Sequence, residues 1–61
     1  MTSLTPKELT AIEDQLNHEQ TLINKYQAMA CICTDNNDAN QFRDYANKHQ
    51  MHYDTLISFL K

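Results

Sequence analysis

The chain has 61 residues, no glycine, one proline, an aromatic content of 8% and a net charge of −3. This composition favours one small all-α domain over residues 1–61, because little in it would build strands and tight turns. The acidic charge argues against a nucleic-acid partner, and no apolar run approaches the ~20 residues of a membrane span. The first residues lack the basic-then-apolar pattern of a secretory signal, so we expect a cytoplasmic protein without membrane association.

A helix start is encoded near the N-terminus. Thr5 is suited to cap the first turn, Pro6 to occupy the first helical position, and Glu8 to complete a capping box. No glycine or proline follows, which predicts an unbroken helix over residues 6–33. Its residues at alternating spacings of three and four form a stripe that is typical of a helix packed lengthwise on another helix. The stripe contains Leu9, Ile12, Leu16, Glu19, Ile23, Tyr26, Ala30 and Cys33.

The next segment has the chemistry of a turn. Residues 34–35 are polar, and Asp35 can cap a following helix by accepting a hydrogen bond from the Asp38 backbone N–H. We expect a second helix over residues 36–60, antiparallel to the first because the connection is so short. Its own stripe contains Ala39, Phe42, Ala46, His49, Tyr53, Leu56 and Leu60.

Only Glu19 and His49 interrupt the apolar character of the two stripes. They lie at equal distances along the chain on either side of Thr34. Because both helices rise equally per residue, a fold centred on Thr34 brings the two residues to one level. This arrangement predicts either a structural hydrogen-bonded pair that fixes the helix register or part of a metal site.

The metal interpretation adds His52, which lies one turn beyond His49 on the same helix face. Imidazole and carboxylate ligands suit zinc, iron or manganese. We therefore identify Glu19, His49 and His52 as candidate metal ligands. His18 is expected to point outward, because adjacent helical residues are rotated by about 100°.

The apolar stripes are wider than a hairpin alone requires. Leu22 and Met29 widen the first, and Tyr45, His52 and Phe59 repeat at intervals of seven beside the second. This width predicts that two hairpins dock as a symmetric homodimer and form a four-helix bundle.

Cys31 and Cys33 are expected to stay reduced, with Cys33 in the stripe and Cys31 nearer the surface. Two residues apart on a helix, they point to different sides and are poorly placed for a mutual disulfide. A single Cys-x-Cys is also a poor zinc signature, and nothing nearby would activate either thiol as a nucleophile.

Three segments together carry a family resemblance: Leu9 to Gln20 (LTAIEDQLNHEQ), the Lys25-Tyr26 pair, and His49 to Leu56. With them, the chain from Leu4 to Leu60 resembles the small ferritin-like spore coat proteins of the coat F type. The resemblance implies a half-ferritin hairpin, a ferritin-like four-helix bundle and, in sporulating bacteria, either a role in the spore coat with coat proteins as partners or an unassigned role.

The sequence departs from the ferritin pattern at one position. Ferritin-like di-iron sites use a Glu from one helix and Glu-x-x-His from another. Glu19 and His49 match this pattern, but Ala46 replaces the second Glu. We therefore expect a non-enzymatic structural or assembly protein with a degenerate metal layer. The alternatives are a metal-binding ferritin-like protein or redox enzyme, and an adaptor that lends its apolar flank to another helical protein.

Overall fold

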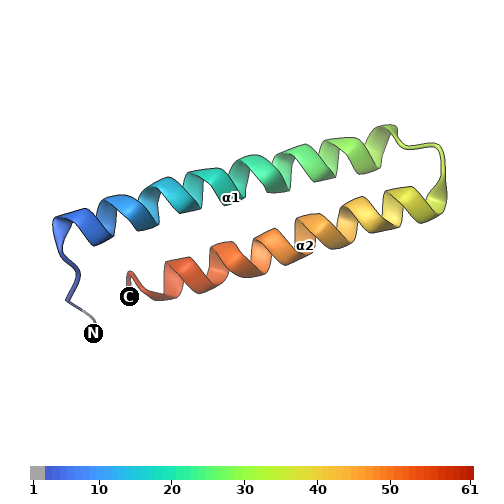
Figure 1. The fold of residues 1–61 in the computed structure, drawn as a ribbon. Helices are drawn as coiled ribbons and strands as arrows, with labels where there is room; N and C mark the ends of the chain where they lie inside the picture. The colour runs from blue at the N-terminus through green and yellow to red at the C-terminus, as the bar shows by residue number, and fades with distance from the viewer. Residues whose placement is uncertain (1–2) are drawn as a thin grey trace.

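The computed structural model describes residues 3–61, which form two helices joined by a short turn (Figure 1). Helix α1 spans Pro6–Ile32 and helix α2 spans Asn36–Ser58. The helices lie side by side and antiparallel, so the start of α1 and the end of α2 lie at the same end of the hairpin. The predicted all-α hairpin is confirmed.

Both helix starts follow the predicted capping chemistry. The Thr5 hydroxyl accepts from the Glu8 N–H at 3.1 Å, and the Glu8 carboxylate accepts from the Thr5 N–H at 3.0 Å, which completes the capping box. At α2, one Asp35 carboxylate oxygen accepts from the N–H groups of Asn37 and Asp38, at 2.8 and 3.1 Å. These bonds satisfy backbone donors that the first helical turn leaves without partners.

Both helices end slightly earlier than the sequence predicted. Cys33 is the C-cap of α1 and lies outside the helix, although its N–H still donates to the Met29 carbonyl at 3.1 Å. Phe59 and Leu60 form a turn after α2, with backbone bonds to Leu56 and Ile57. These three-residue bonds tighten the last turn, as is common where a helix end has little packed against it.

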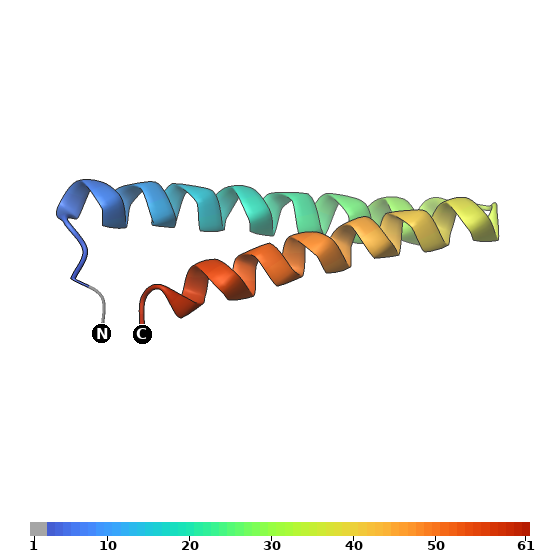
Figure 2. The same ribbon diagram turned by 60° about the horizontal axis from the view of Figure 1, so that its bottom comes forward.

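The side chains buried between the helices confirm the predicted stripes. Every buried residue among 3–61 belongs to one of the two stripes: Glu19, Ile23 and Ala30 on α1, and Ala39 and Ala46 on α2. The three alanines all lie in the half of the hairpin nearer the turn. Seen from the side in Figure 2, the helix axes diverge toward the termini.

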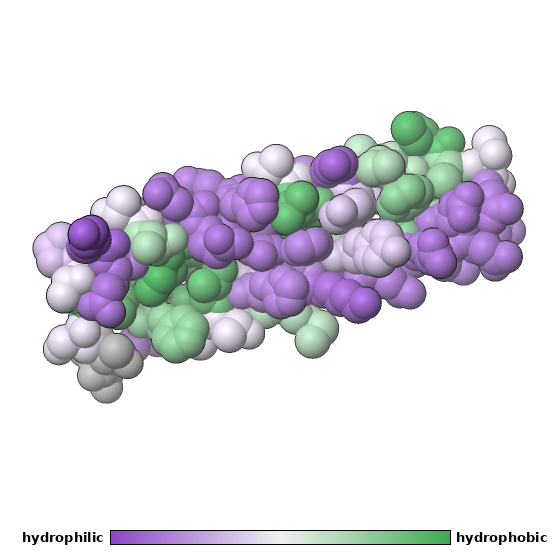
Figure 3. Space-filling view, in the orientation of Figure 1, coloured by the Kyte–Doolittle hydropathy of each residue, from purple (hydrophilic) through white to green (hydrophobic). Residues whose placement is uncertain are grey.

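The hairpin is a thin rod. Its extents are 46 × 16 × 10 Å and its radius of gyration is 14.3 Å, against about 10.5 Å for a compact chain of this length. Hydrophilic residues cover most of the side visible in Figure 3, and hydrophobic surface shows both toward the start of α1 and along α1 near the turn. Neither helix contains a stretch long and apolar enough to span a membrane.

Candidate metal centre

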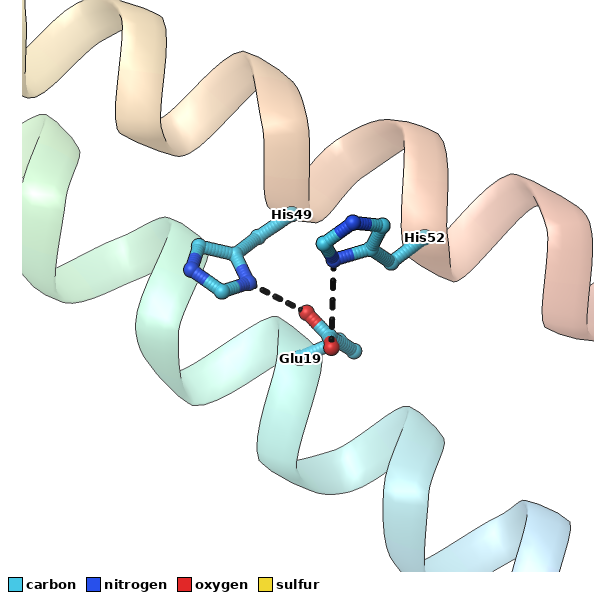
Figure 4. Close-up of side chains that lie close together, drawn as sticks. All are labelled: Glu19, His49 and His52. Carbon is cyan, nitrogen blue, oxygen red and sulfur yellow. Dashed lines mark hydrogen bonds and ion pairs between the residues drawn. The ribbon is translucent and has the colours of Figure 1, made fainter.

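The centre of the hairpin holds the predicted contact between an acid and an imidazole. Glu19 projects from α1 and His49 from α2, and Figure 4 shows the two side chains pointing toward each other. The His49 Nδ1 lies 2.6 Å from the Glu19 Oε2, although the residues are 30 positions apart in the chain. Because an ionised carboxylate only accepts hydrogen bonds, Nδ1 carries the proton in this contact.

The two partners differ in their access to water. The Glu19 side chain is only 7% exposed, whereas the His49 side chain is 24% exposed. Burial acts to raise the pKa of the Glu19 carboxyl. Hydrogen bonds from His49 and Gln15, together with the charges of His49 and His52, outweigh burial and hold that pKa below its ordinary value. Glu19 is therefore a buried carboxylate that stays ionised at neutral pH.

His52 extends the pair to a cluster of three. Its Nδ1 lies 3.5 Å from the Glu19 Oε1, the oxygen that His49 does not contact (Figure 4). The rings of His49 and His52 are 5.3 Å apart and nearly perpendicular, at 83°. The His52 side chain is 58% exposed, so this side of the cluster is open to solvent.

Two further residues hold the cluster in place. The Gln15 side-chain amide donates to the Glu19 Oε1 at 3.3 Å, from one turn earlier on α1. The Tyr26 ring stacks on the His49 imidazole, with centroids 5.7 Å apart and planes 11° apart. Gln15 was not among the predicted site residues, although its spacing of four residues from Glu19 was a usable signal. The stacking depends on side-chain geometry across the two helices, which the stripe alone does not give.

Glu19, His49 and His52 each offer one ligand atom, and these three atoms all lie within 4.8 Å of one another. Among residues 3–61 this is the one cluster of histidine, cysteine and acidic side chains with that geometry. A possible metal site therefore exists at the predicted position. His18 is exposed on α1 and is not part of the cluster, as the sequence analysis expected.

The two cysteines are also outside the cluster. Both are free thiols, with Cys31 exposed and Cys33 half-buried. This agrees with the expected placement of Cys33 in the stripe and Cys31 nearer the surface.

The position that would complete a ferritin-like ligand set holds a buried methyl group. Ala46, three residues before His49, is only 3% exposed and faces α1. The cluster thus contains a single carboxylate, whereas di-iron sites of the ferritin type use four across a bundle. The donor set suits one ion bound by two nitrogens and an oxygen.

Comparison with known proteins gives no relative from which a function could be transferred. No family model, curated protein or solved structure matches the chain. The resemblance to coat F proteins therefore stays a prediction, carried by the three sequence segments named above.

Proposed function

We propose that the chain is a small structural, assembly-type protein whose hairpin pairs with a second copy to form a four-helix bundle. The observation that carries this proposal is the lack of a sufficient core. The apolar core among residues 3–61 consists of Ile23 and three alanines, Ala30, Ala39 and Ala46. Chains of this size usually need a disulfide, a metal or association with another chain to be stable.

The large accessible surface of the hairpin also supports pairing with a second copy. The accessible surface is 4744 Å², whereas a compact monomer of 7.1 kDa exposes roughly 4,100 Å². A standard interface buries about 800 Å² per partner, which is close to the roughly 650 Å² that the hairpin exposes in excess. One partner of similar size therefore suffices to cover it.

One side of the hairpin is suited to that partner. We call it the apolar face and define it by Leu22 and Met29 on α1 and Tyr45 and Phe59 on α2, with the polar His52 between the last two. Each of these residues directly precedes a stripe position, and in antiparallel helices such positions lie on the same side. Tyr45 is 41% exposed and Phe59 is 48% exposed, so they present apolar surface that a second hairpin can bury.

The opposite side is mostly polar. The residues on this side include Glu13, Gln20 and Gln27 on α1 and Arg43 and Gln50 on α2, and Ile57 near the end of α2 is the apolar exception. The contrast between the two sides favours one docking partner on the apolar face over an indiscriminate aggregate.

Sedimentation equilibrium at micromolar chain concentration tests the pairing. We expect twice the chain mass of 7.1 kDa for the natural sequence and a shift to monomer for Leu22→Lys, which puts a charge on the apolar face. Gln27→Lys is the matched control, since it adds the same charge on the opposite side and should leave the dimer intact. A well-folded monomer, or equal loss of the dimer in both variants, contradicts the proposal. A poorly helical monomer points instead to an adaptor that needs a different partner.

The resemblance to coat F proteins supports a coat role for this assembly. In that role the bundle is a building unit of the spore coat, with other coat proteins as neighbours. Antibody detection in purified spore coats of the source organism tests this assignment. Signal only in the soluble fraction of the mother cell contradicts it and leaves the dimer unaffected.

A metal-binding protein is the second candidate function, and the cluster of Glu19, His49 and His52 favours it. Ferritin-like redox chemistry is less well supported, because Ala46 replaces a bridging carboxylate and two iron ions would have too few anionic ligands. Elemental analysis of protein purified without a histidine tag tests metal binding. Stoichiometric metal that is lost in Glu19→Ala supports it. Metal-free protein whose melting temperature is unchanged by chelators or added metal contradicts it.

A further inference from the structure

We infer that Glu19, His49 and His52 form a mononuclear site for a divalent ion of the zinc class, with four-coordinate geometry and one position not filled by the hairpin. This inference rests on the metal-binding function proposed above. All three ligands come from one chain, so a single hairpin can supply them, although His52 lies on the apolar face that a second copy would cover.

The spacing of the ligand atoms suits a tetrahedral ion. Zn–N and Zn–O bonds of about 2.0–2.2 Å place the ligand atoms of a tetrahedral site roughly 3.4 Å apart. The 3.5 Å from His52 Nδ1 to Glu19 Oε1 is close to this spacing, whereas His49 contacts the other carboxylate oxygen, so the carboxylate or the His49 ring must reorient for one oxygen to serve both. The 2.6 Å from His49 Nδ1 to Glu19 Oε2 is a direct hydrogen bond, and it must open by under about 1 Å for an ion to take the place of the proton.

The donor atoms favour zinc over harder or more weakly bound ions. Magnesium and calcium prefer all-oxygen ligand sets, whereas this cluster supplies two imidazole nitrogens and one carboxylate. For a given set of nitrogen and oxygen ligands, zinc binds more tightly than manganese(II) or iron(II). Two histidines and one glutamate are also a known zinc ligand set in proteins.

The residues around the cluster already orient its ligands. Gln15 donates to the Glu19 carboxylate at 3.3 Å, and Tyr26 stacks on the His49 ring. Such supporting contacts reduce the reorganisation that metal binding requires. His52 is the most exposed ligand, at 58%, and gives the ion a route of entry from solvent.

Isothermal titration of tag-free, chelator-stripped protein with ZnCl₂ tests the inference. We expect one ion per chain, and we expect Co²⁺ in place of zinc to give the intense visible absorption of a four-coordinate ion. His52→Asn should weaken zinc binding by at least ~10-fold, which corresponds to about 1.4 kcal/mol. Because His52 is exposed, this variant should keep its helicity, which circular dichroism checks. His18→Asn is the matched control and should bind zinc as the natural sequence does.

The outcomes separate this inference from the broader proposals. Two ions per chain, a six-coordinate cobalt spectrum or unchanged zinc affinity in His52→Asn overturns the inference and leaves metal binding standing. Equal weakening in His18→Asn also overturns it, since binding would then not be specific to the cluster. No binding at all overturns both the inference and the metal-binding function, while sedimentation reports separately on pairing.

Discussion

Removing His49 should cost far more stability than removing its partner Glu19. In His49→Ala, a carboxylate that is only 7% exposed loses its 2.6 Å hydrogen bond. A buried polar group that loses its partner costs about 1–3 kcal/mol, and the lost stacking on Tyr26 adds about 0.5–1.5 kcal/mol. Gln15 still donates to Glu19 at 3.3 Å, and water can enter the space left by the ring, so part of this cost is offset. We expect a loss of about 2 kcal/mol.

Replacing Glu19 instead of His49 leaves the more exposed residue of the pair without its partner. In Glu19→Leu, the group left without a partner is His49, which is 24% exposed and can hydrogen-bond to water. The new leucine adds apolar contact along the stripe. Because replacement of a buried polar pair by packed apolar groups is often neutral or favourable, we expect no loss of unfolding free energy.

Thermal and urea unfolding followed by circular dichroism measures both effects. A chelator in the buffer removes any metal, and a fixed chain concentration is needed because the proposed pairing would add to apparent stability. For a chain of this size, 2 kcal/mol corresponds to a melting temperature lower by about 8–16 °C. His18→Ala is the control, because it removes an exposed histidine. If His49→Ala and His18→Ala unfold alike, or if Glu19→Leu loses its helicity, the reasoning about a shared buried layer is wrong.

The remaining predictions concern the helix starts, pH and metal removal. Thr5→Ala should lower the free energy of unfolding by about 1 kcal/mol in urea, because it removes one side of the capping box; a change below about 0.3 kcal/mol would contradict this. Asp35→Ala should cost a similar amount, since one carboxylate oxygen serves two backbone N–H groups. The Thr5 N–H donates to the Glu8 carboxylate and holds the pKa of Glu8 below its ordinary value of 4.5. As pH falls, Glu8 therefore takes up a proton in the unfolded chain before it does so in the folded chain. The Glu8 contribution to stability is present above pH 4.5 and is lost as pH falls through the folded pKa. Glu8→Gln should flatten the pH dependence of urea unfolding in that window. Zinc at 100 times its dissociation constant should stabilise the natural sequence by about 2.7 kcal/mol, and EDTA should reverse this in a melting experiment.

The sequence predicted the hairpin because local and long-range signals agreed. The capping box at Thr5, the cap at Asp35 and the two stripes all define the same pair of helices, and equal rise per residue then sets the register. The predicted ends at Cys33 and Leu60 were too late by one and two residues. At Cys33 the backbone becomes extended, and at Phe59 and Leu60 the last helical turn tightens, while the stripe continues; apolar periodicity reports neither change.

The candidate site was predictable in its members and less so in its geometry. Glu19 and His49 are conspicuous because they interrupt apolar stripes at one level. The difference in their exposure, and the stacking of Tyr26 on His49, depend on side-chain conformations across the two helices. Pairing depends on a second chain, and metal occupancy depends on an ion. The stripe pattern of a single chain favours both and establishes neither.

The uneven size of the stripe residues has a dynamic consequence. Near the turn, Ala30 and Ala39 let the backbones approach closely, whereas Leu9 and Leu60 at the far end are about 40% exposed. Local opening is easiest where buried contacts are few, so the hairpin should fray from its termini inward. Amide hydrogen exchange should then be fastest in the first turns of α1 and the last turns of α2. It should be slowest in the helical segments between the Glu19 layer and the turn, which include Ala39. The pair of Glu19 and His49 thus lies at the boundary between a stable half of the hairpin, next to the turn, and a half that opens more readily.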